Sequence, residues 1–308
     1  MEEKIASNSF KAWTLAARPK TLTGAAIPVL LAGALAIHDS TFRVVPWLGC
    51  LLFAFLMQID ANFINDLYDY KKGTDRDDRL GPERACSQGW ITSEAMLRGI
   101  IVVSATASIV GLLTVASVWQ LLPYRGLEFV IIGILCLAFA VLYTTVFSYR
   151  GWGDALVLIF FGLIPVCGTY YLMAQSIPST ALTSGFISGI AIDALLVINN
   201  YRDRDQDRIS GKRTLVVRYG EKFGELHYLG IGIAVSLLIL LLPFLSDEPI
   251  DAKTLFYLIP IAIYGALHLR TWRQMIATNY GKALNIYLGQ TSRNMFIMAI
   301  LLAAAMIF

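Results

Sequence analysis

Two short segments of this 308-residue chain place acidic and amide side chains at the spacing of an α-helix. The first segment contains Asn62, Asn65, Asp66 and Asp69, at positions i, i+3, i+4 and i+7. Because an α-helix turns by about 100° per residue, these four side chains share one face. Gly73 offers a point at which the chain can leave the helix and bring Asp75 back toward that face. We therefore expect a group of oxygen ligands within residues 62–84.

A second segment, residues 199–213, repeats this pattern later in the chain. It contains Asn199, Asp203 and Asp207 at i, i+4 and i+8, with Asn200 beside them. These side chains form another stripe on one helix face. The shared Asn-x-x-x-Asp spacing at Asn65 and Asn199 suggests a pseudo-repeat.

Carboxylates gathered in this way need a cation, because they repel one another and the repulsion grows at the edge of a low-dielectric region. Asp and Asn oxygens suit a hard divalent ion, and Mg²⁺ commonly completes its octahedron with water and phosphate oxygens. Basic side chains that could pair with phosphate are interleaved with the acids. They are Lys72, Arg76, Arg79, Arg84, Arg208, Lys212 and Arg213. A charged helix end can also be an ion-paired, solvated face, but two stripes in the same register favour a magnesium diphosphate site.

The elements that must position these residues are membrane-spanning helices. Of all residues, 56% are hydrophobic and only 15% are charged, which exceeds the apolar content of a soluble globular domain. Apolar runs long enough to cross the bilayer lie near residues 22–37, 44–64, 95–118, 127–147, 154–175, 180–200, 226–245, 254–269 and 284–308. We predict an all-α, polytopic membrane protein of nine transmembrane helices, forming a single domain over residues 1–308 with two cytoplasmic loop caps.

Positive charge in the connections predicts the orientation, because Lys and Arg accumulate on the cytoplasmic side. Of the 25 Lys and Arg residues, Arg43, Arg125 and Lys253 fall on one side, and Arg98 and Arg293 fall within predicted helices. The other twenty lie on the side of the N-terminus and both Asp-rich segments. We therefore expect a cell-membrane (inner-membrane) protein with the N-terminus and the site loops cytoplasmic. The net charge of +3 follows from these loops and does not indicate nucleic-acid binding.

At these motifs the sequence resembles the UbiA superfamily of intramembrane aromatic prenyltransferases. Members of this superfamily carry Asn-Asp-x-x-Asp after the second helix and Asp-x-x-x-Asp after the sixth. The matching runs here are Asn65-Asp66-Leu67-Tyr68-Asp69 and Asp203-Arg204-Asp205-Gln206-Asp207. The runs Lys71-Lys72-Gly73, Asn199-Asn200-Tyr201-Arg202-Asp203 and Thr214-Leu215-Val216-Val217-Arg218 resemble the branch that acts on 1,4-dihydroxy-2-naphthoate.

The resemblance implies transfer of a polyprenyl group from polyprenyl diphosphate to 1,4-dihydroxy-2-naphthoate, with loss of CO₂ and diphosphate, to give demethylmenaquinone. It implies Mg²⁺ ligands at Asn65, Asp69, Asp75, Asp203 and Asp207. It implies a catalytic group of Asp66, Asp69, Asp203 and Asp207. It implies diphosphate contacts from Lys72, Arg79, Lys212 and Arg213, with Asn62 and Asn199 in the polar wall.

The chemistry leaves one role open, because a carboxylate could assist by removing a proton from a ring hydroxyl. Asp66 and Asp193 are the candidates, and Asp193 is also expected in the polar wall. Two other functions stay open: prenylation of another aromatic acceptor such as 4-hydroxybenzoate, and ion-coupled membrane transport. A transporter would place its acids near the bilayer midplane on broken helices.

Overall fold

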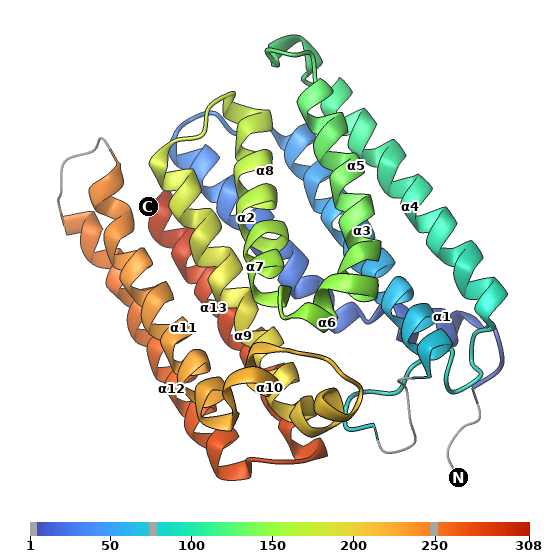
Figure 1. Ribbon diagram of the computed structural model, residues 1–308. Coiled ribbons are helices and arrows are strands. Elements are labelled where there is room, and N and C mark those ends of the chain that lie inside the picture. Colours follow the sequence, from blue (N-terminus) through green and yellow to red (C-terminus); the bar gives the residue numbers. More distant parts are fainter. Residues whose placement is uncertain (1–4, 74–78, 247–251) are drawn as a thin grey trace.

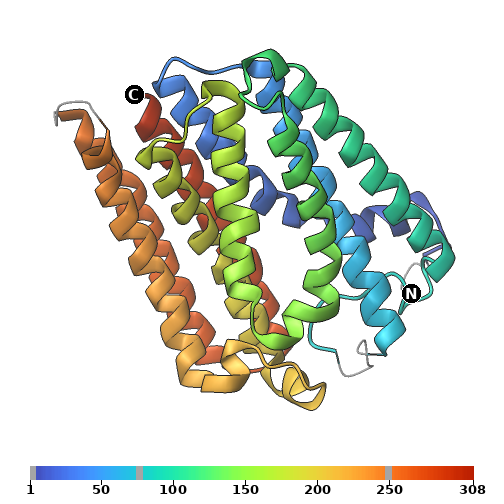
Figure 2. The same ribbon diagram turned by 45° about the horizontal axis from the view of Figure 1, so that its top comes forward.

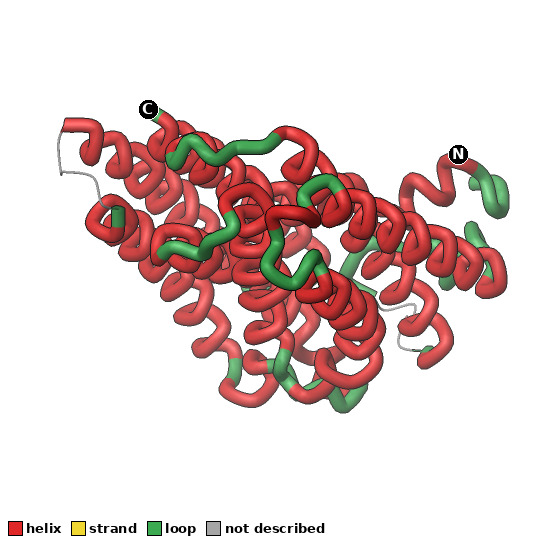
Figure 3. Tube along the Cα trace, turned by 90° about the horizontal axis from the view of Figure 1, so that it is seen from above, coloured by secondary structure: helices red, strands yellow, loops and turns green. Residues whose placement is uncertain are grey.

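The computed structural model describes residues 5–73, 79–246 and 252–308. Within these ranges every regular element is a helix (Figure 3). Nine helical stretches are long and apolar enough to cross a membrane, which confirms the predicted number within the described residues. They are Phe10–His38, Val44–Lys72, Ser93–Ala116, Leu127–Phe147, Gly153–Ala174, Ser179–Ile209, Glu221–Leu245, Ala252–Thr278 and Lys282–Ile307.

Several of these stretches contain breaks or tighter turns. The first consists of α1 (Phe10–Ala17) and α2 (Leu22–His38), separated at Arg18, which has a left-handed backbone. The remaining helices are α3 (Val44–Lys72), α4 (Ser93–Ala116), α5 (Leu127–Leu142), α6 (Ser148–Arg150), α7 (Gly153–Leu158), α8 (Ile164–Ala174), α9 (Ser179–Ile209), α10 (Leu215–Tyr219), α11 (Glu221–Leu241), α12 (Leu258–Thr278) and α13 (Asn285–Ile307). Two π-helical segments, Tyr143–Phe147 and Ile159–Leu163, join α5 to α6 and α7 to α8.

The two helices that carry the Asp-rich motifs extend well beyond their predicted apolar runs. The runs ended near residues 64 and 200, whereas α3 continues to Lys72 and α9 to Ile209. Neither segment contains glycine or proline before Gly73 and Gly211, so nothing in the sequence stops the helix earlier. Gly73 then ends α3 in a left-handed conformation, with φ of 66°. Both motifs therefore lie on continuous helix.

The helices form one bundle with α9 near its centre (Figure 1). Helix α9 packs against α2, α7, α8, α11 and α13, while α4 lies at one edge and the α11–α12 pair at the other (Figure 1; Figure 2). Large apolar side chains on α4, such as Ile101, Val102 and Leu113, are more than half exposed. Since a bilayer accepts such a surface and water does not, these side chains indicate the lipid-facing side.

Both motif-bearing helix ends lie at the same end of the bundle. The C-terminal ends of α3 and α9, the short α10 and the start of the described chain are all at the bottom of Figure 1, and the C-terminus lies at the opposite end. The N-terminus and both Asp-rich segments therefore share one side of the molecule, as the distribution of Lys and Arg predicted.

Asp60 and Arg293 are charged residues within membrane-spanning helices, and their surroundings differ. Asp60 is buried in α3, where its carboxylate accepts a hydrogen bond of 2.7 Å from the Ser104 hydroxyl of α4. This contact links two adjacent spans. Arg293 is on the exposed face of α13.

Glycines allow α9 to approach the π-helical segment Ile159–Leu163 closely. Gly185 and Gly189 form a Gly-x-x-x-Gly pair on α9, which is typical of tightly packed membrane helices. A Cβ at Gly162 would lie 2.4 Å from the Gly185 carbonyl oxygen and 2.8 Å from the Gly189 Cα atom. These are backbone atoms, so the contact cannot be relieved by moving a side chain.

We expect Gly162→Ala to lower the free energy of unfolding by about 1–3 kcal/mol, because overpacking must separate two helices. Gly133→Ala is the matched control, since a Cβ at Gly133 in α5 would meet no atom within 4 Å. Thermal unfolding of the purified proteins in detergent measures the difference. Equal stability of the two variants would contradict this account of the α9 contact.

Candidate active site

A polar cavity of about 510 Å³ lies between the motif-bearing ends of α3 and α9. Eight predicted site residues that the structure describes line it together with others from several elements. Its wall includes Asn65, Asp69, Lys72, Arg79, Asn199, Asn200, Asp203, Asp207 and Lys212. It also includes Arg18, Arg84, Tyr143, Thr144, Asp154 and Arg202. The structure therefore brings the two Asp-rich motifs, far apart in sequence, to one cavity.

The α3 side of the cavity is organised by contacts with the loop after α3 and with the end of α5. Asp69 Oδ2 lies 2.7 Å from Nη2 of the buried Arg84. Asn65 Oδ1 accepts a 2.6 Å hydrogen bond from the hydroxyl of Thr144, which lies in the π-helical turn after α5. Lys72 donates to the Thr145 carbonyl oxygen at 3.2 Å. These contacts orient Asn65, Asp69 and Lys72 into the cavity.

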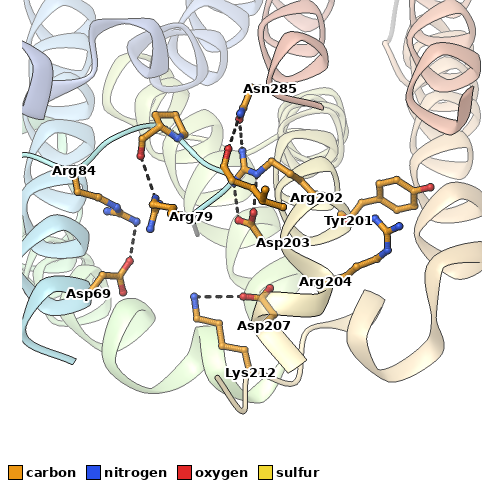
Figure 4. Close-up of polar contacts among 12 residues, drawn as sticks. Asp69, Arg79, Arg84, Tyr201, Arg202, Asp203, Arg204, Asp207, Lys212 and Asn285 are labelled. Atoms are coloured by element: carbon orange, nitrogen blue, oxygen red, sulfur yellow. Dashed lines mark hydrogen bonds and ion pairs between the residues drawn. The ribbon is translucent and has the colours of Figure 1, made fainter. Parts of the chain in front are cut away.

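On the α9 side of the cavity, ion pairs hold Asp203 and Asp207. Arg202 holds both oxygens of Asp203, with N–O distances of 2.7 and 2.6 Å, and Lys212 Nζ lies 3.7 Å from Asp207 Oδ1. Figure 4 shows these pairs opposite Asp69 and Arg84, with Arg79 between the two groups. Tyr201 and Arg204 point the other way, and Arg204 binds Asn279 and Glu221. One face of α9 thus serves the cavity and the other anchors the neighbouring helices.

A chain of hydrogen bonds holds the loop after α3 over α9. Arg202 Nη1 donates to Asn285 Oδ1 at 2.6 Å, and Asn285 Nδ2 donates to the Leu80 carbonyl oxygen at 2.7 Å. Arg79 Nε donates to the Pro82 carbonyl oxygen at 3.1 Å. The loop that supplies Arg79 and Arg84 is therefore tied to both α9 and α13.

The described lining of the cavity carries more positive than negative charge. Its four carboxylates belong to Asp69, Asp154, Asp203 and Asp207. Its six basic side chains belong to Arg18, Lys72, Arg79, Arg84, Arg202 and Lys212. Nη2 of Arg18 is buried without a hydrogen-bond partner among the described residues. A buried cationic donor that lacks a partner and an excess positive charge both suit a polyanion.

The same cavity fits a hard divalent cation. Asn65, Asp69, Asp203 and Asp207 present oxygen atoms from both sides, and no Cys or His belongs to the described lining. This donor set matches Mg²⁺, which prefers a few carboxylates and shares its remaining positions with water and phosphate. Asp75, another predicted ligand, lies outside the described residues.

Two predicted site residues on α3, Asp66 and Asn62, do not line the described cavity. Both make hydrogen bonds that hold the surrounding structure. Both oxygens of the buried Asp66 accept backbone N–H bonds, from Ala85 at 2.8 Å and Cys86 at 2.9 Å. The Asn62 amide donates to the Ala17 carbonyl oxygen and the Thr21 hydroxyl, each at 3.0 Å. Asp66 therefore anchors the loop after α3 and is not part of the described cavity lining, while its catalytic role stays a prediction.

Arg213 and Asp193 are the other two predicted site residues, among those that the structure describes, that do not line the cavity. Arg213 is exposed and its backbone N–H bonds to the Tyr149 carbonyl oxygen, so its side chain is not part of the described cavity lining. Asp193 is buried in α9 behind the wall, near His227 and Asp154.

Sequence reasoning assigned no role to several lining residues, such as Arg18 and Thr144. Arg18 carried a detectable signal, a basic residue and a proline directly before the first long apolar run. Thr144 carried none, because it lies in the sequence at the end of an apolar helix and reaches the cavity through the π-helical turn.

Comparison with known proteins agrees with this geometry. Residues 25–300 match the UbiA prenyltransferase family. The chain belongs to this family. A Haemophilus influenzae relative named 1,4-dihydroxy-2-naphthoate octaprenyltransferase is 35% identical over 235 residues, covering 73% of this chain and 75% of the relative. Relatives of the same name from Escherichia coli and Mycobacterium tuberculosis are 34% and 31% identical, covering 91% and 97% of this chain and 96% and 98% of the relatives.

A solved structure described as digeranylgeranylglyceryl phosphate synthase has the same fold. It aligns with a TM-score of 0.62 at 16% sequence identity and covers 96% of this chain and 98% of that chain. The UbiA helical bundle therefore accounts for nearly the whole length of the protein.

The role of Asp66 leads to a prediction about stability. We expect Asp66→Ala to lower the free energy of unfolding by about 2 kcal/mol or more, because it leaves two buried N–H groups without an acceptor. Asp205→Ala is the control, since Asp205 is on the exposed side of α9 and its ion pair among the described residues is with the exposed Arg208. Thermal unfolding in detergent measures both, and an Asp66 variant as stable as the control would rule out the anchoring role.

Proposed function

We propose that this UbiA-family enzyme transfers a polyprenyl group from polyprenyl diphosphate to 1,4-dihydroxy-2-naphthoate, with loss of CO₂ and diphosphate, to give the quinol form of demethylmenaquinone. The main supporting observation is the single cavity onto which both Asp-rich motifs converge, lined by excess positive charge. The names of relatives that are 31–35% identical over most of the chain support the choice of acceptor.

In this proposal Asn65, Asp69, Asp203 and Asp207 would hold Mg²⁺, with Asp75, which lies outside the described residues, as a further predicted ligand. The bound ion supplies electrostatic stabilisation of the diphosphate as it departs. Lys72, Arg79 and Lys212 contact phosphate oxygens, as do Arg18 and Arg84, which line the same wall. Their charge lowers the barrier to breaking the allylic carbon–oxygen bond.

The aromatic acceptor then attacks the allylic carbon that is left electron-deficient. Tyr143 lines the cavity between the two motifs, where its ring face can stabilise a developing cation. The polyprenyl tail stays in the bilayer or between helices, because each buried CH₂ group contributes about 0.8 kcal/mol to remaining out of water. The water-soluble acid reaches the cavity from the polar end of the bundle.

We further propose that the protein lies in the cell membrane with the cavity and the N-terminus on the cytoplasmic side. The positive charge of the loops at that end supports this orientation. Cysteines introduced at Ile209 and Tyr124, which are exposed at opposite ends, can be compared with a membrane-impermeant maleimide in intact cells. Labelling at Tyr124 and protection at Ile209 are expected, and the reverse pattern would invert the topology.

Purified protein incubated with 1,4-dihydroxy-2-naphthoate, a prenyl diphosphate and Mg²⁺ tests the proposed reaction through released CO₂ and prenylated product. EDTA should abolish turnover and added Mg²⁺ should restore it. Activity with 4-hydroxybenzoate and none with the naphthoate would assign a different acceptor. The acids of the two Asp-rich motifs lie at one end of the bundle, which disfavours an ion transporter, since a transporter would need them near the midplane.

We expect Asp203→Asn to lower turnover by at least about 100-fold, because it removes a metal ligand that stabilises the departing charge. Asp205→Asn, two residues away on the exposed side of α9, should keep nearly full activity. Product formation by both variants, normalised to inserted protein, provides the comparison. Full turnover in the Asp203 variant would overturn the metal assignment.

A further inference from the structure

A second group of ionisable side chains lies against the cavity wall and belongs to neither Asp-rich motif. It consists of Asp154, Asp193 and His227, whose ligand atoms all lie within 4.8 Å of one another. His227 lies between the two acids: Nδ1 is 3.9 Å from Asp154 Oδ1, and Nε2 is 3.5 Å from Asp193 Oδ2. We refer to these three residues as the Asp–His–Asp cluster.

Three different spans contribute to the cluster. Asp154 lies in the first turn of α7 and lines the cavity, so it faces the substrates. Asp193 lies on α9, ten residues before Asp203 and therefore about 15 Å further into the bundle along the helix axis. His227 lies on α11, and the side chains of Asp154, Asp193 and His227 are 16%, 9% and 23% exposed. The cluster thus connects the cavity to the bundle interior.

Each member also has a polar atom without a hydrogen-bond partner. Asp154 Oδ1, Asp193 Oδ1 and His227 Nδ1 are all buried and unsatisfied among the described residues. A buried polar atom without a partner destabilises the folded protein. Three such atoms within one cluster indicate a role that structural stability does not explain.

The arrangement is suited to holding a proton that can move. Two carboxylates this close in a low-dielectric region cannot both stay ionised beside a neutral imidazole, so the three groups share protons. Tyr143 is another ionisable side chain in the same cavity wall. A proton delivered to Asp154 can therefore be stabilised by His227 and Asp193.

We propose that the Asp–His–Asp cluster takes a proton from the acceptor hydroxyl during prenyl transfer and returns it afterwards. This inference rests on the proposed function. Asp154 is the catalytic residue, because it is the member that lines the cavity. His227 and Asp193 are positioning residues that act through it.

The chemistry of the acceptor requires a proton to move from its hydroxyl to Asp154 and later back to the same oxygen. As the new carbon–carbon bond forms, the O–H electron pair of the neighbouring hydroxyl enters the ring, its proton passes to Asp154, and the allylic carbon–oxygen electron pair leaves on diphosphate. The attacked carbon now bears both the prenyl group and the carboxylate, next to a ketone. Loss of CO₂ returns its electron pair to the ring, and the oxygen regains the proton from Asp154. The net result is one prenyl group gained and one CO₂ lost, with no net proton change.

Asp154→Asn and His227→Gln test the proposal through turnover measured against pH with 1,4-dihydroxy-2-naphthoate. We expect the Asp154 variant to lose about 100-fold or more in turnover near neutral pH, the usual effect of losing a general base. Its turnover should then rise about tenfold per pH unit while the acceptor hydroxyl ionises in solution. The His227 variant should show a smaller loss with the same dependence. The KM for prenyl diphosphate should stay within about twofold.

His268→Gln is the matched control, because His268 is a buried histidine that stacks on Tyr228 outside the cavity. It should leave the pH profile unchanged. Magnesium-dependent binding of a prenyl thiolodiphosphate shows that each variant is folded with an intact diphosphate site. A wild-type protein inactive on the naphthoate would refute the proposed function. An active wild type whose Asp154 and His227 variants both keep full turnover at all pH values would refute only the proton shuttle.

Metal analysis of the purified wild type and the His227 variant tests a further alternative, that the Asp–His–Asp cluster binds a metal ion. An Asp–His–Asp set also suits Mn²⁺ or Zn²⁺. One equivalent of either metal in the wild type that is lost in His227→Gln would overturn the shuttle and make the cluster a metal site. Absence of that metal, together with the altered pH profile, supports the proton shuttle.

Discussion

Charge at the edge of a low-dielectric bundle must be balanced inside the protein, and this requirement shapes the whole active end of the molecule. An isolated buried carboxylate or guanidinium is costly in such a place, whereas pairing offsets much of the cost. Asp69 with Arg84, Asp203 with Arg202, and Asp207 with Lys212 satisfy it by bringing opposite charges together. The described lining nevertheless retains more basic than acidic side chains, which leaves the cavity ready for an anion.

The same residue type serves different purposes one helical turn apart. Asp66 and Asp69 lie on the same face of α3, yet the former accepts two backbone N–H bonds and the latter meets a guanidinium in the cavity. On α9, Arg202 faces the cavity while Arg204 ties the opposite face to neighbouring helices. The structural contacts hold the loop and helix that carry the reactive groups, so anchoring and chemistry are coupled through adjacent residues.

Close packing sets the relative position of the two sides of the cavity. Gly162, Gly185 and Gly189 bring the segment after α7 directly against α9, which places Asp154 beside Asp193 and the end of α9. The bond chain from Arg202 through Asn285 to Leu80 closes the cavity from the other side. Alignment of diphosphate, acceptor and proton-accepting groups therefore depends on contacts among helices that are distant in sequence.

Much of the fold could be predicted from the sequence, because crossing a bilayer imposes strong local rules. Apolar runs of sufficient length indicated the number of spans, and the period of Asn and Asp residues indicated two helical stripes. The types of these residues indicated a metal and a polyanion. These signals are local: they depend on hydropathy, helical period and side-chain chemistry over a few turns.

Only the tertiary structure decided which of those residues meet. By spacing alone, Asp66 and Asp69 are equally good candidates for the cavity wall. In the structure the loop after α3 covers Asp66 and leaves Asp69 at the cavity. Tyr143 and Thr144 reach the wall through a π-helical turn that no periodicity predicts, and His227 joins Asp154 and Asp193 from a separate span. Sequence spacing determines the face of a helix on which a residue lies, whereas long-range packing determines what that face meets.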